Sequence, residues 1–302
     1  MNRTVVRHSL LLLLTAAIWG FAFVAQSVGM DYVGPFTFTA VRSVIGGVVL
    51  LPFIAFRDRK NKLDNEAQKQ KNHDLLMGGI LCGILLFIAS NLQQIGIQYT
   101  TVGKSGFVTA MYIVLVPVLG IFLHKKTGWQ IWTSVGIAVV GMYFLCMTEG
   151  SFVMERGDVL TLLCALAFSF QILAVDYFAP RVDGVKLACI QFFTCGIFSA
   201  VPMFVMEQPQ PEKILAAWLP ILYAGVLSNG VAYTLQIIAQ RGMNPTVASL
   251  LMSMESVFSV LAGFIILHQK LSSRELAGCA LMFTAIILVQ LRFNKKSNVN
   301  GD

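Results

Sequence analysis

Two formally charged residues, Arg42 and Glu255, lie deep within long apolar stretches of the sequence. Charged groups inside a membrane are costly, and they usually pair with one another or line an ion or solute path. The helix rise places Glu255 about 15 Å into its stretch, where a buried carboxyl group can carry a proton. An ion pair with Arg42 is equally natural. Glu255 is turned about 100° or more from Ser249 and Ser256 around the helix, which favours a contact with a neighbouring helix.

Polar residues form four stripes within other apolar stretches. At about 100° per residue, the members of each stripe fall on one helix face. Side chains of this kind face protein or a water-filled cavity. They also form helix-to-helix hydrogen bonds worth about 0.6 kcal/mol each, so both interpretations remain open. The stripes are Asn91, Gln94 and Gln98; Ser105, Thr109 and Tyr112; Asn229, Tyr233, Gln236 and Gln240; and Ser249, Ser253 and Ser256.

The stretches that carry these residues are long enough to cross a membrane. Of the 302 residues, 56% are hydrophobic and 12% are charged, which excludes an ordinary water-soluble enzyme. A crossing helix needs about 20 mostly apolar residues. We therefore predict an all-α membrane protein with ten transmembrane helices, at 8–29, 36–56, 75–98, 103–123, 128–148, 157–179, 185–206, 215–240, 244–267 and 274–293.

The basic residues lie in the short gaps between these spans. With the N-terminus inside, sixteen Lys and Arg fall on the cytoplasmic side and five outside. This bias predicts that both termini are cytoplasmic in a plasma (inner) membrane. Because the basic residues do not cluster on one surface, we expect no nucleic acid partner.

The second half of the chain aligns on the first. Thr15 to Gly47 matches Cys164 to Gly196 without gaps, which places Trp19 on Phe168 and Arg42 on Gln191. Further along, Gln94 and Gln98 fall on Gln236 and Gln240. The predicted halves are 1–150 and 151–302, with five spans each. Because five is odd, the second half would enter the membrane from the opposite side, as in carriers built from inverted repeats.

Several segments resemble the EamA-type branch of the drug/metabolite transporter superfamily. They are Ile18-Trp19-Gly20-Phe21-Ala22-Phe23, the stretch from Gly106 to Pro117, Met254-Glu255-Ser256-Val257-Phe258, and the turn His268-Gln269-Lys270-Leu271. Ser256 stands where the family commonly has proline, and Gln269 stands where it has an acidic residue. The resemblance implies ten helices and the transport, usually export, of small metabolites.

The residues also predict where such a solute would bind. Trp19 and Phe168 lie roughly 16 Å into their spans, which is the midplane. With Thr109, Tyr112, Tyr233, Ser253 and Ser256 they would frame a neutral pocket with aromatic walls. Inverted topology sends Gln94 and Gln98 toward the outer face and Gln236 and Gln240 toward the cytoplasm. An amphipathic metabolite, such as an amino acid or a drug-like compound, suits these groups.

Other functions remain as alternatives. A membrane-embedded enzyme is disfavoured because Glu255 is the one deep carboxylate and no HExxH motif occurs. Composition does not exclude a receptor, although the internal duplication favours a carrier. No cofactor is implied. The expected partners are a small-molecule solute and the lipid bilayer, and a homodimer is possible.

Overall fold

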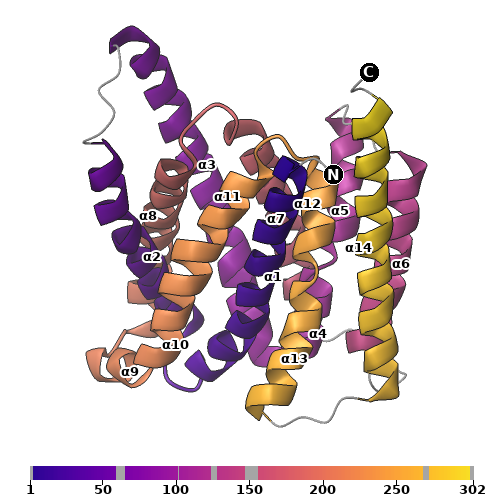
Figure 1. The fold of residues 1–302 in the computed structure, drawn as a ribbon. Helices are drawn as coiled ribbons and strands as arrows, with labels where there is room; N and C mark the ends of the chain where they lie inside the picture. The colour runs from indigo at the N-terminus through magenta and orange to yellow at the C-terminus, as the bar shows by residue number, and fades with distance from the viewer. Residues whose placement is uncertain are drawn as a thin grey trace.

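The computed structural model describes residues 3–58, 65–100, 102–123, 128–146, 156–267 and 272–299. These residues are almost entirely helical and contain no strand (Figure 1). The predicted boundary between the halves at 150 and 151, and the turn at 268–271, lie outside the described residues.

The helices follow one another in two series. The first comprises α1 (Arg3–Gly29), α2 (Pro35–Asp58), α3 (Asn65–Gly96), the short η1 (Ile97–Tyr99), α4 (Val102–Thr109), α5 (Tyr112–Phe122) and α6 (Trp129–Cys146). The second comprises α7 (Arg156–Phe178), α8 (Gly184–Pro202), the π-helical η2 (Met203–Glu207), α9 (Pro211–Ala216), α10 (Trp218–Leu222), the π-helical η3 (Tyr223–Tyr233), α11 (Thr234–Gln240), α12 (Pro245–Met252), α13 (Glu255–Leu267) and α14 (Ser273–Val299).

Within the part of the chain that the structure describes, eight helical segments are long and apolar enough to cross a membrane. They are Thr4–Gly29, Pro35–Asp58, Asn72–Tyr99, Val102–Phe122, Arg156–Phe178, Gly184–Glu207, Trp218–Gln240 and Pro245–Ile266. Eight of the ten expected spans are thereby matched in length and composition. The two others coincide with α6 and α14, whose described apolar parts, Ile131–Phe144 and Leu276–Leu288, are shorter than a full crossing requires.

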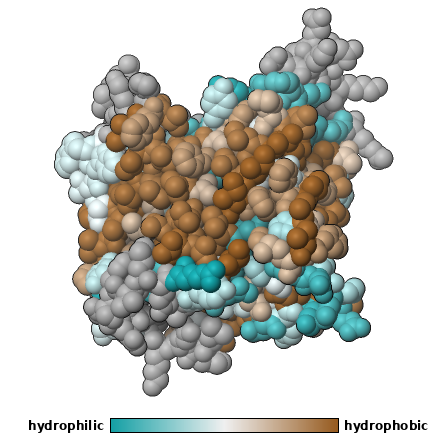
Figure 2. Space-filling model, turned by 180° about the vertical axis from the view of Figure 1, so that it is seen from behind, coloured by the Kyte–Doolittle hydropathy of each residue, from teal (hydrophilic) through white to brown (hydrophobic). Residues whose placement is uncertain are grey.

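One face of the bundle is apolar across its middle. Figure 2 shows a broad hydrophobic surface on one face, with hydrophilic residues gathered toward both ends. The large hydrophobic side chains that are exposed on the bundle include Phe56, Phe204, Val205 and Leu219. Such a surface is unfavourable in water and suits contact with lipid.

Helices of one series pack mainly on helices of the other. The third span, α3, lies along α7 and α8, and its counterpart, α10 with η3 and α11, lies along α1 and α2. Glycines allow the close approach: a Cβ added to Gly20 of α1 would lie 2.3 Å from the Cβ of Phe258 on α13. The core is therefore shared between the two series.

Two spans that were expected to be continuous are broken near their middles. Turns at Ala110 and Met111 separate α4 from α5, and turns at Ser253 and Met254 separate α12 from α13. At both breaks the backbone bonds tighten to the i→i−3 pattern, as in Ile113 N–H to Ala110 O at 3.0 Å. No glycine or proline stands at either break, and both stretches are apolar enough for a single span. The sequence therefore contained no signal from which the breaks could be predicted.

The antiparallel helices α2 and α8 are held together at both ends. At one end, both carboxylate oxygens of Glu207, just past α8, accept hydrogen bonds from the first backbone amides of α2, Phe36 at 2.9 Å and Thr37 at 2.7 Å. At the other end, Asp183 caps α8 by accepting from Val185 N–H and Lys186 N–H, and it also pairs with Arg57 of α2.

The carboxyl group of Asp183 lies outside the spans. Burial alone raises the pKa of Asp183, but hydrogen bonds from Arg57 and from the amides of Lys186 and Val185 outweigh this effect. The pKa of Asp183 therefore lies below its ordinary value, and this end of the pair is held by a charged carboxylate at neutral pH.

Candidate functional site

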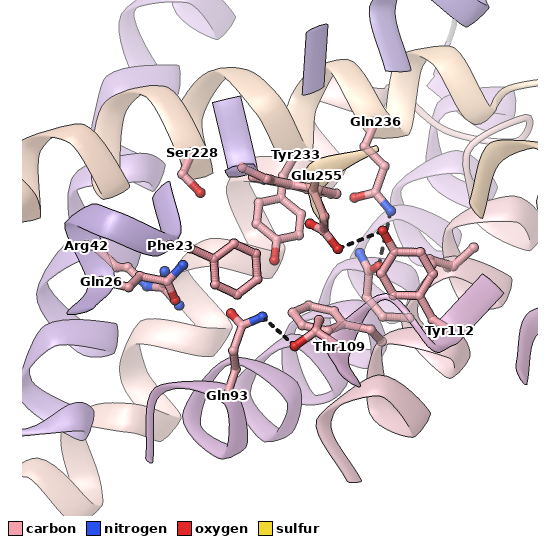
Figure 3. A pocket seen from close by; sticks show the side chains of 14 residues that line it. Phe23, Gln26, Arg42, Gln93, Thr109, Tyr112, Ser228, Tyr233, Gln236 and Glu255 are labelled. Carbon is pink, nitrogen blue, oxygen red and sulfur yellow. Dashed lines mark hydrogen bonds between the residues drawn. The ribbon is translucent and has the colours of Figure 1, made fainter. Parts of the chain in front are cut away.

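A small cavity lies at the centre of the bundle, where the two broken spans meet α1, α2, α3, α7 and the η3–α11 helix (Figure 3). Its volume is about 30 Å³. It receives side chains from both series of helices. Eight residues expected to bind solute or to carry charge line it: Trp19, Arg42, Thr109, Tyr112, Phe168, Tyr233, Gln236 and Glu255.

Four other expected residues instead form hydrogen bonds outside the cavity. Asn91 of α3 donates to Ser199 Oγ of α8 at 2.8 Å. Asn229 of η3 donates to Ser43 Oγ of α2 at 3.5 Å. Ser253 and Ser256 are fully buried and donate to backbone carbonyl groups, those of Leu250 and Gly106. For these side chains, the structure shows the helix-to-helix and within-helix hydrogen bonds that the sequence had left open.

The remaining two expected residues, Gln94 and Gln98, also lie off the cavity wall. Gln94 donates to the backbone carbonyl of Gln26 at 3.1 Å and so joins α3 to α1. Gln98 lies in η1 and is exposed. On the predicted stripe of the third span, Asn91 and Gln94 thus make contacts between helices, whereas the adjacent Gln93 lines the cavity.

Six lining residues were not predicted: Phe23, Gln26, Gln93, Gln171, Ile172 and Ser228. A signal for several of them was present in the sequence. Phe23 and Gln26 stand four and seven residues after Trp19, and Gln171 and Ile172 stand three and four after Phe168. These are the spacings of one helix face. Extending the face from each midplane aromatic residue would have found them.

The break in the ninth span explains the direction of Glu255. Glu255 is the first residue of α13, and its side chain lies on the cavity wall. The expected angle was measured along a continuous α-helix. The i→i−3 bonds at Ser253 to Ser256 rotate each residue by more than the α-helical 100°. The angle between Ser249 and Glu255 around the helix therefore differs from the one calculated for a continuous α-helix.

Glu255 is hydrogen-bonded to the other broken span. Tyr112 is the first residue of α5, and its hydroxyl group donates to Glu255 Oε1 at 2.8 Å (Figure 3). Both side chains are buried, with 3% and 4% of their surfaces exposed. A second bond at the breaks joins Gln93 Nε2 to Thr109 Oγ1 at 3.3 Å.

The expected ion pair between Arg42 and Glu255 is not formed. The ion pairs of the described residues lie elsewhere, at Arg57–Asp183, Lys186–Asp58, Lys104–Asp158 and His73–Asp74. The guanidinium of Arg42 instead stands 5.5 Å from the ring centroid of Phe38. Its Nε is buried without a hydrogen-bond partner. The expectation of a neutral pocket is also corrected, because both formally charged side chains line it.

The cavity wall carries buried polar atoms that no protein group satisfies. Besides Arg42 Nε, these are Trp19 Nε1, Gln26 Oε1 and Gln236 Oε1. Buried polar groups are nearly always hydrogen-bonded, so a cluster of unsatisfied ones needs an explanation. Donors and acceptors together on one wall are suited to a polar ligand or to water.

Aromatic rings form another part of the wall. The rings of Trp19 and Tyr233 lie 4.6 Å apart between centroids, and Phe192, which is not a lining residue, stands edge-on to Tyr233 at 5.9 Å. A cavity of about 30 Å³ holds no more than a water molecule or two. A larger solute would need helices or side chains to move apart.

Comparisons with known proteins give the family and the fold. The model of a family described as the EamA-like transporter family matches residues 7–147 and 155–291. A transporter of Archaeoglobus fulgidus is 30% identical over 93% of this chain and 85% of its own length, and is named an uncharacterized transporter.

More distant relatives cover the chain to a similar extent. The uncharacterized transporter YoaV of Bacillus subtilis is 23% identical over 92% of this chain and 95% of its own. The uncharacterized inner membrane transporter YedA of Escherichia coli is 21% identical over 91% and 87%. A solved crystal structure with 19% identity superposes with a TM-score of 0.78 over 96% of this chain and 98% of its own, which supports the fold alone.

Proposed function

Since the chain belongs to the EamA-like transporter family, we propose that it carries a small organic solute through the central cavity by alternating access. The solute is an amphipathic metabolite, such as an amino acid or a drug-like compound, and the net direction is export. The apolar helices and the family match show a multi-pass membrane protein of a transporter family, and the transporter relatives support transport over catalysis.

The observation that carries the proposal is the cavity at the two helix breaks. Discontinuous helices near the bilayer midplane are a common way for transporters to build a solute site. Here the first residues after the breaks, Tyr112 and Glu255, both line the cavity. Residues of α1, α2 and α11 that carry unsatisfied polar atoms line the same cavity.

The packing supports two inverted five-helix repeats within ten spans. The contact of α3 with α7 has its counterpart in the contact of the η3–α11 helix with α1. The start of α1 and the end of α14 lie at the same end of the bundle (Figure 1). An exchange of this kind is expected when two copies are related by an axis in the membrane plane.

The location that we propose is the inner (plasma) membrane, with both termini in the cytoplasm. The excess of basic residues in the gaps on the side of the termini supports this orientation. The Escherichia coli relative is named an inner membrane transporter.

A test of alternating access that needs no known solute uses thiol accessibility. In a variant whose native cysteines are replaced, Ser228→Cys introduces a thiol on the cavity wall by a near-isosteric change. We expect membrane-impermeant reagents to modify this thiol from either side of oriented vesicles. Ser169→Cys is the matched control, because Ser169 is fully buried in α7 and does not line the cavity. Modification of the Ser228→Cys variant from one side alone, or from neither, would overturn alternating access.

A transport screen then identifies the solute. Purified protein in proteoliposomes is tested for counterflow of labelled amino acids and related metabolites, with and without a proton gradient. Counterflow that Tyr112→Ala abolishes places the solute in the cavity. Counterflow that survives both Tyr112→Ala and Tyr233→Ala would place the path elsewhere.

A further inference from the structure

The cavity is lined by one buried basic and one buried acidic side chain that form no ion pair with each other. Arg42 has 4% of its surface exposed, and so does Glu255. In Figure 3 they lie on opposite sides of the Phe23 ring, with Tyr233 between them in the view. A buried charge is tolerated when it is paired and hydrogen-bonded. In the described residues, no ion pair is formed by either group.

Each charged group keeps unused bonding capacity. A carboxylate has about four acceptor sites, and the one hydrogen bond found for Glu255 comes from Tyr112. A guanidinium has five N–H donors, whereas the polar contact found for Arg42 is the face of Phe38. The same wall offers unsatisfied atoms of both kinds, the acceptor Gln236 Oε1 and the donor Trp19 Nε1.

We propose that the site recognises a zwitterion, whose carboxylate binds Arg42 and whose ammonium group binds Glu255. The proposal rests on the proposed transport function and names the charges that the carried solute must have. The rings of Trp19, Phe23 and Phe168 then face the apolar part of the solute.

The charge balance of the cavity supports a zwitterion over singly charged relatives. With Glu255 ionised, Arg42 and Glu255 together carry no net charge, and a zwitterion leaves this balance unchanged while pairing both groups. An amine without a carboxylate leaves Arg42 unpaired, and a carboxylate without an amine leaves Glu255 unpaired. An unpaired charge in a buried site is strongly unfavourable, so the site selects against both.

The distance between the two charges of the solute is determined separately, by comparing two kinds of zwitterion. In an α-amino acid they are adjacent, and in an ω-amino acid a methylene chain separates them. Both share the chemistry that Arg42 and Glu255 read. A comparison of leucine with 6-aminohexanoate distinguishes the two kinds of zwitterion.

The experiment measures binding of four probes to the purified full-length protein by ligand-dependent thermal shift and calorimetry. The probes are leucine, 6-aminohexanoate, leucinamide, which lacks the carboxylate, and 4-methylpentanoate, which lacks the amine. We expect the wild-type protein to bind at least one zwitterion about tenfold or more tightly than leucinamide and 4-methylpentanoate, as expected for a lost buried charge contact.

The two charge-removing variants should change this order in opposite directions. Arg42→Gln keeps Glu255 and should bind leucinamide at least as well as leucine. Glu255→Gln keeps Arg42 and should bind 4-methylpentanoate at least as well as leucine. Arg42→Lys and Glu255→Asp retain the charges and should keep the wild-type order. These reversals separate recognition from a merely structural role, which would weaken all ligands alike.

Three results would overturn the inference. They are a wild-type protein that binds none of the four probes at millimolar concentration, the same order of ligands in both charge-removing variants, and an equal loss of all ligands in both. The thiol-accessibility test of Ser228→Cys is independent of these probes. A protein that passes that test but fails here remains a transporter of another solute class.

Discussion

The two broken spans use the same backbone device but carry different chemistry. In the first half α4 ends at Thr109 and α5 begins at Tyr112, and in the second half α12 ends at Met252 and α13 begins at Glu255. The residue that opens each second segment is a phenol in one half and a carboxylate in the other, and the two are hydrogen-bonded to each other. The breaks therefore meet as donor and acceptor.

The second spans differ in the same way. Arg42 of α2 aligns with Gln191 of α8, and Arg42 lines the cavity whereas Gln191 lies beside Gln171 at 3.5 Å. Each charged group at the centre thus comes from one half and has a neutral counterpart in the other. The scaffold is repeated but the charges are not. We expect a repeated scaffold with unrepeated charges to fix one orientation of a bound solute.

The largest effect should come from exchanging a residue of the scaffold between the halves. Gly20 of α1 aligns with Ser169 of α7, and an added Cβ at Gly20 would lie 2.7 Å from the backbone carbon of Phe258 and 2.8 Å from the nitrogen of Ser259. We expect Gly20→Ser to lower the free energy of unfolding by about 3 kcal/mol, because backbone of α13 must move away from α1. Denaturant unfolding in detergent micelles measures it.

The reciprocal variant is the control for that exchange. Ser169→Gly removes a side chain that donates to the Ala165 carbonyl at 2.7 Å within its own helix. We expect a loss of about 1 kcal/mol from glycine in a helix. Equal losses for the two variants would show that α1 and α7 are packed alike, contrary to the contacts of Gly20.

The next effect tests the bond that joins the two breaks. Tyr112→Phe removes the donor to Glu255 and leaves a buried carboxyl group without its hydrogen bond, which costs about 2 kcal/mol. We expect lower stability and transport reduced about tenfold or more, measured in proteoliposomes. For stability, Tyr233→Phe is the matched control, because no hydrogen bond of the Tyr233 hydroxyl is found in the described residues. Equal effects of both changes would remove the special role of Tyr112.

Sequence reasoning located the cavity where local periodicity is unbroken. Trp19 and Phe168 lie on continuous helices, and the positions expected from the helix rise fall on the cavity wall. It failed where a side chain's direction depends on a break or on a partner. Glu255 follows a break that has no glycine or proline to announce it, and Arg42 was assigned a partner that only a distance could test.

The stripe on α3 failed for another reason. Periodicity identifies the helix face that carries polar groups, but it does not say whether that face meets a cavity or a second helix. Gln94 meets the backbone of α1, whereas the adjacent Gln93 meets the cavity. Both answers satisfy the requirement that polar groups avoid lipid, so the sequence alone cannot choose between them.

A smaller effect is expected at the end of α2, where the cap comes from the other half. Glu207→Ala removes the acceptor of the Phe36 and Thr37 amides and should cost about 1.5 kcal/mol, in the range of lost helix caps. Glu212→Ala is the control, since Glu212 is exposed in the first turn of α9 and should change stability by less than about 0.5 kcal/mol. Thermal unfolding in detergent compares the two. A Glu207→Ala variant as stable as Glu212→Ala would mean that water replaces the cap.

The smallest effect is expected at the opposite end of the α2–α8 pair and appears as a pH dependence. The pKa of Asp183 is lowered in the folded protein, so its stabilising contribution is fully present above the unfolded value of about 4. It is lost as the pH falls below that value through the folded pKa. About a third of the Asp183 and Arg57 side chains is exposed, so solvent screening keeps the contribution modest. The difference in melting temperature between wild-type protein and Asp183→Asn should be constant from pH 7 to about 5 and should shrink below about 4. A difference in melting temperature that stays unchanged down to pH 3 would mean that neither the charge of Asp183 nor its pairing with Arg57 contributes to stability.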